Sequence, residues 1–254
     1  MIELEEHPIL KKGWELYQDL LDFFFPPLCL SCDERLLPDE EYYCGICYGD
    51  FEYMPRPVCA VCGAPLGSRV IEKDTCPDCP PKPIYFDLAR APLLYDGPVV
   101  PGVIALKFNH RLEMAEYFSR ILFYYIKTEM KDEAFDAIVP VPLHFKRYLK
   151  RGYNQAEEMG RFLSKNLGMP LLPEVMKRIR NTPPQTRLEH SRRKKNVAGA
   201  FEVFYPDPIK DRHIILLDDV YTTGSTLNAA ASALKSAGAS KVTALALCRA
   251  IKAP

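Results

Sequence analysis

The sequence lacks the features that would place this chain in a membrane, on an export route or on nucleic acid by charge alone. It contains no run of about eighteen apolar residues, the length that a transmembrane helix needs. Its first residues, MIELEEHPILKK, do not have the layout of a signal peptide. Lysine plus arginine and aspartate plus glutamate are equal at 33 each, so no net charge attracts polyanions, although local patches still can. We therefore expect a cytoplasmic protein without a membrane span.

Other absences narrow the class further. There is no low-complexity tract and no internal repeat beyond the cysteine pairs described below. None of the five histidines, His7, His110, His144, His190 and His213, has a pairing that suggests nucleophilic catalysis. His110 and His144 either line a ligand site or, as the favoured interpretation, are structural. With 254 residues, 48% of them hydrophobic, the chain can bury a real core. One large domain, or a medium domain with a small appendage, would suit this length.

Eight of the nine cysteines fall in four CxxC pairs, which indicates a metal-binding module. The pairs are Cys29/Cys32, Cys44/Cys47, Cys59/Cys62 and Cys76/Cys79. One CxxC turn directs two thiolates at one ion, and a second turn a short loop later completes a tetrahedral set for Zn²⁺. The simplest grouping is sequential, although an interleaved cross-brace stays open. Four sulfurs leave no position for water, so the zinc is expected to be structural.

Three other uses of these cysteines are less favoured. Four copies without a thioredoxin-like setting argue against redox CxxC motifs, and a cytoplasmic location argues against disulfides. An iron–sulfur cluster is the third alternative. The ninth cysteine, Cys248, lies in the apolar run VTALALC and is expected to be a small buried residue in a strand.

Three parts of different character follow one another along the chain. Residues 1–27 contain an amphipathic helix over 9–25 that packs on the body or, less favourably, lies on a membrane surface. Residues 28–84 form the cysteine module, and 85–254 form an α/β domain. In that domain strand-like runs at 87–95, 136–141, 174–179, 214–217 and 241–248 are separated by helical patterns at 98–108, 111–130, 153–167 and 225–237. This alternation predicts a mostly parallel sheet with flanking helices.

The segment HIILLDDVYTTGST, residues 213–226, carries the strongest functional signal. Its aliphatic run predicts a buried strand, after which the acid pair Asp218 and Asp219 lies where open α/β sheets bind ligands. A small, hydroxyl-rich turn then leads into a helix, and such a helix N-terminus can hold a phosphate. Carboxylates repel phosphate, so the acids are better explained by sugar hydroxyls or by Mg²⁺. The segment therefore predicts a site for a phosphorylated sugar.

Two further segments contribute charge. The strand at 136–141 leads into a loop and then into FKRYLKRGY, whose cations Lys146, Arg147, Lys150 and Arg151 either face an anionic ligand or form a solvated surface. Between Lys177 and Lys195 eight cations stand against one acid in a segment without apolar periodicity. Three interpretations of that segment are open: a flexible loop that closes over the site, a charged surface loop, or a segment that binds a nucleic-acid backbone. Its basic residues include Arg187, Arg192, Arg193, Lys194 and Lys195.

The segment 213–226 resembles the phosphoribosyl pyrophosphate (PRPP) signature of type I phosphoribosyltransferases. The resemblance implies that Asp218 and Asp219 contact the ribose hydroxyls, with Mg²⁺ accompanying the ligand. It also implies a pyrophosphate loop at Val141, Pro142 and Leu143, aided by Arg151, and a flexible basic loop that closes over the site. The residues implied to wrap the 5′-phosphate are Thr222, Thr223, Gly224, Ser225 and Thr226.

The whole chain from about residue 20 is similar to the ComF family of competence-associated proteins. Besides the CxxC module, the resemblance rests on ALKFNHR, PVPLH, KRGYNQAE, TPPQTRL, RRKKNVAGAF and LLDDVYTTGST. It implies a zinc ribbon joined to a phosphoribosyltransferase fold, with a link to DNA uptake. Further residues match the family motifs without an assigned role: Lys107, Arg151, Asn154, Gln155, Gln185, Thr186, Arg193 and Asn196.

Two functions remain open from the sequence. The first is a Mg²⁺-dependent phosphoribosyltransferase. The second is a non-catalytic accessory of DNA uptake that binds single-stranded DNA and uptake-machinery proteins, with PRPP or another phosphate ligand as its regulator. The sequence contains no recognisable purine-, pyrimidine- or amine-binding element and no glutaminase-type cysteine, so it predicts the phosphosugar better than any acceptor.

Overall fold

The structure is a computed structural model that describes residues 20–21, 23–67, 76–80, 82–180 and 199–251. The chain divides into two compact units, one comprising 1–51 with 97–102 and the other 52–96 with 103–254. The division falls between the two cysteine quartets, which the sequence does not predict. Most of the expected helix over 9–25 and the basic residues Arg187 and Arg192–Lys195 lie outside the described residues.

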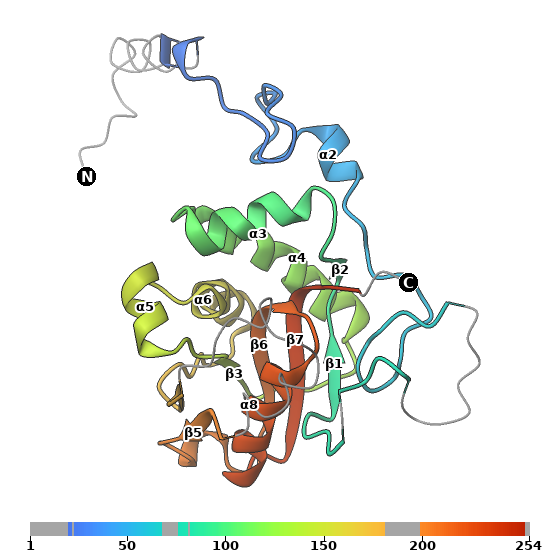
Figure 1. The fold of residues 1–254 in the computed structure, drawn as a ribbon, viewed down its shortest axis with the longest axis vertical. Helices are drawn as coiled ribbons and strands as arrows, with labels where there is room; N and C mark the ends of the chain where they lie inside the picture. The colour runs from blue at the N-terminus through green and yellow to red at the C-terminus, as the bar shows by residue number, and fades with distance from the viewer. Residues whose placement is uncertain (1–19, 22, 68–75, 81, 181–198, 252–254) are drawn as a thin grey trace. The chain divides into compact units, whose positions relative to one another are not determined.

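A parallel sheet forms the centre of the larger unit, as expected. Its order is β1–β7–β6–β3, with β2 also paired to β7, and every pairing within it is parallel. β6 and β7 run side by side through its middle (Figure 1). The strand bounds are Leu88–Arg90 for β1, Leu93–Leu94 for β2, Ala137–Pro140 for β3, His213–Tyr221 for β6 and Lys241–Arg249 for β7.

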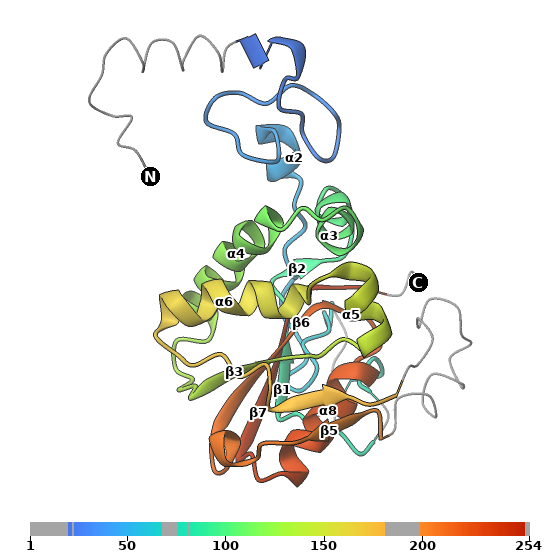
Figure 2. The ribbon, with the colours of Figure 1, turned by 90° about the vertical axis from the view of Figure 1, so that its left-hand side faces the viewer.

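Helices cover both faces of this sheet (Figure 2). α4 and α6 pack together, α6 against β3 and β6, whereas α8 packs against β6 and β7. Leu216 belongs to the core that includes α8, and Leu217 lies toward Gly160 of α6. The helix bounds are Gly45–Gly49 for α2, Val99–Phe108 for α3, Glu113–Glu129 for α4, Phe145–Arg151 for α5, Gln155–Leu167 for α6 and Ser225–Ser236 for α8, with a 3₁₀ turn at Asp207–Ile209.

Two strands differ from expectation. The segment 174–179 forms β4, Met176–Arg178, which leaves the main sheet and pairs antiparallel with β5, Phe201–Val203. Each of these strands buries only its first residue, and an antiparallel ribbon tolerates one solvated face. β6 is longer than its aliphatic run, because pairing with β7 continues to Tyr221 opposite Arg249. The acid pair therefore lies inside the strand.

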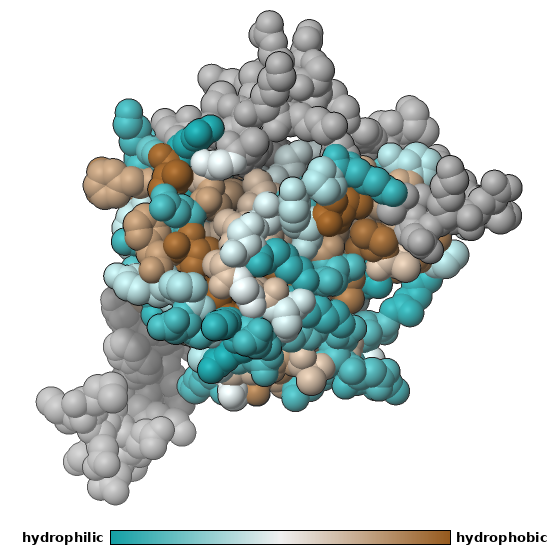
Figure 3. Space-filling model, turned by 90° about the horizontal axis from the view of Figure 1, so that it is seen from below, coloured by the Kyte–Doolittle hydropathy of each residue, from teal (hydrophilic) through white to brown (hydrophobic). Residues whose placement is uncertain are grey.

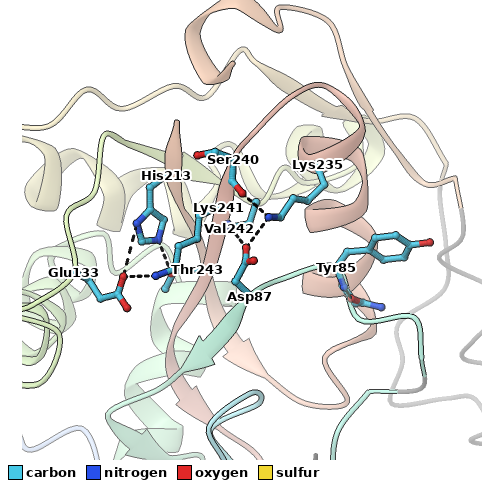
Figure 4. Close-up of polar contacts among 10 residues, drawn as sticks. Tyr85, Asp87, Glu133, His213, Lys235, Ser240, Lys241, Val242 and Thr243 are labelled. Atoms are coloured by element: carbon cyan, nitrogen blue, oxygen red, sulfur yellow. Dashed lines mark hydrogen bonds and ion pairs between the residues drawn. The ribbon is translucent and has the colours of Figure 1, made fainter. Parts of the chain in front are cut away.

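Polar side chains fix the amino ends of β6 and β7 (Figure 4). His213 Nε2 lies 2.8 Å from Thr243 Oγ1, and Glu133 accepts from Lys241 Nζ at 2.5 Å. Burial, with a contribution from Lys241, lowers the pKa of His213, so its neutral form is favoured. Asp87 Oδ2 accepts from the Val242 N–H at 2.7 Å. With these ends tied by structural contacts, the carboxyl ends are the edge at which a ligand can bind.

No helix within the described ranges combines the length and the apolar content needed to span a bilayer. The face in Figure 3 mixes hydrophilic side chains with separate hydrophobic patches.

The first CxxC pair of each quartet forms a turn of the same design. In one turn the Cys29 N–H donates to Glu34 O and the Leu36 N–H to Pro27 O; in the other the Cys59 N–H donates to Ala64 O and the Leu66 N–H to Pro57 O. A residue with positive φ follows the second cysteine in both, Asp33 at 59° and Gly63 at 69°. The duplicated turns thus share one backbone conformation.

Gly63 belongs to a turn that lies against the sheet of its own unit. A Cβ on Gly63 would stand 2.5 Å from the carbonyl oxygen of Ala89 in β1. The Ala89 N–H in turn donates to Val61 O at 2.7 Å. Glycine at this position therefore permits direct backbone contact between the second turn and the edge strand.

We predict that Gly63→Ala destabilises the protein more than Gly67→Ala. Both glycines have positive φ, but no atom of the described residues lies within 4 Å of a Cβ on Gly67. Left-handed backbone alone costs about 1–2 kcal/mol, and the clash with Ala89 adds about 1–3 kcal/mol at Gly63. Midpoints of thermal unfolding compare the variants. Equal midpoints would show that the turn does not depend on its contact with β1.

Candidate functional site

Asp218 and Asp219 lie beyond the point where β3 ends. Pro140, the last residue of β3, pairs with Leu217, so the two acids follow at an edge that β3 no longer covers. Successive side chains of a strand point to opposite faces. Asp219 is on the face of α6, and Asp218 is on the face of α8. The two carboxylates are therefore placed for different partners.

Asp219 is held by two side chains from other elements. Its Oδ1 lies 2.8 Å from Lys107 Nζ of α3, and its Oδ2 accepts from Gln155 Nε2 of α6 at 2.9 Å. Burial would lower the pKa of Lys107, but the charge of Asp219 outweighs it and raises that pKa. Lys107 is thus a cation at neutral pH. Both oxygens of Asp219 have protein partners, so this carboxylate holds Lys107 and Gln155 in position beside the site.

Asp218 has a different environment. Its Oδ1 accepts from the backbone N–H of Asp219 at 2.9 Å. Burial, followed by the charge of Asp219, raises the pKa of Asp218 to about 7, while Lys107 and Arg178 act in the opposite direction. Asp218 therefore changes protonation near neutral pH, and a cation or a hydrogen-bond donor beside it would favour the carboxylate.

Cations surround the acid pair on the side of α5. Arg147 and Arg151 are half-buried, whereas Lys146 and Lys150 on the same helix are exposed. Arg178 of β4 has its pKa lowered to about 10 by burial and by the nearby charge of Arg147, with Asp218 acting in the opposite direction. Of the four cations expected on α5, Arg147 and Arg151 are thus partly buried, and Arg178 of β4 lies near Arg147. Such a group of guanidinium ions is suited to a polyanion.

The hydroxyl-rich turn at 222–226 leads from β6 into α8. Gly224 has φ of 72° and is the N-cap of α8, and it brings no side chain to cap the first turn. Thr223 Oγ1 lies 2.9 Å from Ser225 Oγ and accepts from the Ser225 N–H at 3.4 Å. Backbone N–H groups, hydroxyls and the positive end of the helix dipole thus gather at one place.

The loop at Val141, Pro142 and Leu143 is tied to both sides of the site. The Val141 N–H donates to Leu217 O at 2.8 Å, and Asn154 Nδ2 donates to Val141 O at 3.0 Å. Asn154 also caps α6, because its Oδ1 accepts from the Ala156 N–H. His144 caps α5 in the same way, because its side chain accepts from the Lys146 N–H, so His144 has a structural role.

Eight cysteine sulfurs gather into two groups of four, in sequential order. Cys29, Cys32, Cys44 and Cys47 form one group and Cys59, Cys62, Cys76 and Cys79 the other, and within each group the sulfurs lie within 4.8 Å of one another. Sulfur pairs at 3.7 Å (Cys32 and Cys44), 3.8 Å (Cys59 and Cys79) and 3.5 Å (Cys62 and Cys76) approach the separation of about 3.8 Å in a tetrahedral zinc–thiolate site. These donor sets suit structural zinc.

Thiolate formation is favoured at the first cysteine of each turn. Burial would raise the pKa of Cys59, but hydrogen bonds from backbone N–H groups, that of Cys62 first, lower it to about 7. The same balance lowers the pKa of Cys29 to about 7. Cys248 stands apart from both groups: it is buried in β7, 3.7 Å from Asp219 O.

The structure thus brings together residues that are distant in sequence. Lys107, Asn154 and Gln155 were visible only as parts of motifs without a role, and the structure places each of them on the acid pair or the loop beside it. Arg178 carried no signal beyond its charge. Gln185, Thr186, Arg193 and Asn196 lie outside the described residues.

Comparison with known proteins agrees with this architecture. Residues 20–80 match the double zinc ribbon domain, and residues 165–253 match the phosphoribosyl transferase domain. DNA utilization protein YhgH of Escherichia coli is 31% identical over 227 residues, which cover 88% of this chain and 97% of that protein. Competence protein F of Haemophilus influenzae is 28% identical over 231 residues, 89% of this chain and 99% of that protein.

Among solved structures, adenine phosphoribosyltransferase of Thermoanaerobacter pseudethanolicus is 14% identical, with a TM-score of 0.36 over 59% of this chain and 85% of that one. The sequence relationship to the E. coli and H. influenzae proteins spans both the zinc ribbons and the transferase domain. The chain belongs to the ComF family of competence-associated proteins.

Proposed function

We propose that this protein binds PRPP in the cytoplasm, at the carboxyl end of β6. The observation that carries the proposal is the order of groups along this one segment: an acid pair at the open edge of the sheet, followed at once by the turn at 222–226 and the start of α8. A ribose 5-phosphate presents hydroxyls and a phosphate in that same order. The phosphate would accept from the N–H groups and hydroxyls of the turn.

In this proposal the two acids have separate tasks. Asp218 accepts from the ribose hydroxyls, because Asp219 is buried and each of its oxygens already contacts Lys107 or Gln155. Asp219 fixes the position of Lys107 and of α6 beside the ligand. The expectation from the sequence that both acids contact the ribose is therefore narrowed to Asp218.

The pyrophosphate group would lie toward the loop at 141–143. Arg147, Arg151 and Arg178 approach the acid pair from that side, and their mutual repulsion is relieved when an anion binds between them. Mg²⁺ would accompany the pyrophosphate, since this ion combines one or two protein carboxylates with phosphate oxygens. Asp218 is the carboxylate placed for it, and the ion would neutralise charge on the leaving group.

The same arrangement supports phosphoribosyl transfer. Pyrophosphate would leave C1′ of the ribose through an oxocarbenium-like state, with the guanidinium groups of Arg147 and Arg178 stabilising the departing charge. The protein would contribute position and electrostatics rather than a nucleophile. An open groove of about 630 Å³ runs along α8 and is lined by Ser225 of the turn but by neither acid.

We predict that Asp218→Asn weakens PRPP binding at least tenfold in the presence of Mg²⁺. Because the pKa of Asp218 is raised to about 7, the carboxylate forms as the pH rises, so wild-type affinity should increase between about pH 6 and about pH 8. The variant should keep only the pH dependence of the ligand itself. Isothermal titration calorimetry measures both effects.

Asp207→Asn is the matched control, because Asp207 is an exposed acid on the 3₁₀ turn before β6. Its affinity and pH profile should equal those of the wild type. Unchanged PRPP binding by Asp218→Asn would end the assignment of this acid to the ligand.

Binding of single-stranded DNA is the second candidate function, and a surface on α5 favours it. The helix FKRYLKR has four cations and no acid. Phe145 is 67% exposed and Tyr148 45%, while Phe108 of α3 is 65% exposed with the Arg151 guanidinium 5.2 Å from its ring centre. Exposed aromatic rings among cations can stack bases and contact phosphates of a single strand. The basic segment ending at Lys195 would add to this attraction.

We predict that Phe145→Ala combined with Tyr148→Ala lowers affinity for an oligothymidine by about thirtyfold or more, since stacking contributes about 1–3 kcal/mol per base and two rings are removed. Neutralising Arg192–Lys195 should instead flatten the salt dependence of binding. Fluorescence anisotropy measures both. Tyr124→Ala removes an equally exposed ring from α4 and is the control. If that control loses as much affinity as the α5 variant, the α5 surface is not the binding site.

A further inference from the structure

The second cysteine quartet is joined to the sheet that carries the phosphosugar site. Its first turn contacts β1 through Gly63 and Val61, as described above. Arg90 of β1 also donates from Nη1 to Ala60 O at 3.1 Å. The quartet and the sheet belong to the same compact unit, whereas the first quartet belongs to the other.

Arg249 of β7 makes a second connection between this quartet and the sheet. It is the last residue of β7 and only 5% exposed. Its Nη1 donates to Cys62 O at 2.5 Å, and its Nη2 lies 3.8 Å from Cys62 Sγ. Zinc held by four thiolates carries a net charge of about −2, and a guanidinium beside one of the sulfurs compensates part of it. Arg249 is therefore placed to respond to the occupied metal site.

The other face of Arg249 contacts the residue that precedes the phosphate turn. The guanidinium carbon lies 4.0 Å from the ring centre of Tyr221, directly opposite in the β6–β7 ladder. Tyr221 is 2% exposed, and burial raises its pKa far above the usual range. This ring is thus fixed between the arginine and the turn.

Gly224, the N-cap of α8, lies against Tyr221 and the end of the cysteine module. A Cβ at Gly224 would stand 2.4 Å from Tyr221 Oη and 2.8 Å from Cγ of Pro80, the residue after Cys79. The turn at 222–226 is therefore supported on one side by a strand residue and on the other by the residue next to a metal ligand.

Asn228 links the segment that follows Cys79 to α8. Its Nδ2 donates to Pro83 O at 2.9 Å, and its Oδ1 accepts from the Tyr85 N–H at 2.7 Å. The chain that leaves Cys79 is thus bound to the first turns of the helix whose N-terminus forms the candidate phosphate site.

We propose that the second cysteine quartet is part of the phosphate site's support: its zinc positions the turn at 222–226 through Arg249, Tyr221 and Pro80, so that loss of this zinc lowers affinity for a 5′-phosphate. The first quartet has no such role. Arg249 and Tyr221 are positioning residues, since they act on the ligand through the backbone of the turn. The ligand part of this inference rests on the proposed function.

The two quartets provide matched variants for the test. Cys76→Ser with Cys79→Ser and Cys29→Ser with Cys32→Ser should each lose one zinc, as measured by elemental analysis. Calorimetry with ribose 5-phosphate should show at least tenfold weaker binding for the second-quartet variant and less than twofold change for the first. Equal affinities of the two variants would overturn the proposal.

Arg249→Met keeps all eight cysteines of the two quartets, so it tests the proposal without removing a zinc ligand. It therefore controls for a loss of affinity that is caused only by unfolding. It should retain the zinc content of the wild type, bind ribose 5-phosphate about tenfold more weakly, and be partly rescued by Arg249→Lys. Wild-type affinity in Arg249→Met would overturn the proposal.

Amide hydrogen exchange separates this inference from the proposed function. Exchange at residues 221–228 should become faster in Arg249→Met and in the second-quartet variant, with or without ligand. If the wild type fails to bind ribose 5-phosphate, the proposed function fails, yet exchange still decides whether the quartet supports the turn. Unchanged exchange would contradict the inference.

Discussion

The parallel ladder between β6 and β7 is the constraint on which the rest of the larger unit depends. It runs from His213 opposite Lys241 to Tyr221 opposite Arg249, whereas β3 stops opposite Leu217. The four residues of β6 beyond that point pair with β7 only, so the acid pair lies at an edge that β3 does not cover, with Asp218 partly exposed and Asp219 buried. The same extension carries Arg249 to the second cysteine quartet. One pairing thus positions the acids, the turn into α8 and the contact with the metal module.

The duplicated cysteine turns show how a repeated element diverges. Both use the same backbone hydrogen bonds and the same left-handed residue after CxxC. Asp33 satisfies that conformation in the first turn, because asparagine and aspartate tolerate it better than most residues. In the second turn the approach of Ala89 leaves room only for Gly63. The second turn is therefore adapted to contact with the sheet, and the chain divides into its two units between the quartets.

Much of this arrangement could be predicted from the sequence, because its signals are local. The run IILL specified a buried strand, the CxxC spacing specified the quartets, and TTGST specified a turn into a helix. The contacts of Lys107 and Gln155 with Asp219 could not be predicted, since they depend on how α3 and α6 pack. The opposite orientation of the two acids follows from strand alternation, but only once β6 is known to continue to Tyr221. Arg249 gave no signal, because a single arginine ending an apolar strand is usually solvated.

We propose that the edge of β6 binds ribose 5-phosphate and that the second zinc ribbon supports this site. The most direct test is a crystal structure of the full chain grown with PRPP and Mg²⁺. We predict that the 5′-phosphate lies against the backbone N–H groups of 223–226, the ribose hydroxyls beside Asp218 and the pyrophosphate toward Arg147 and Arg178. A ligand bound elsewhere, or a phosphate that does not touch the turn at 222–226, would contradict it.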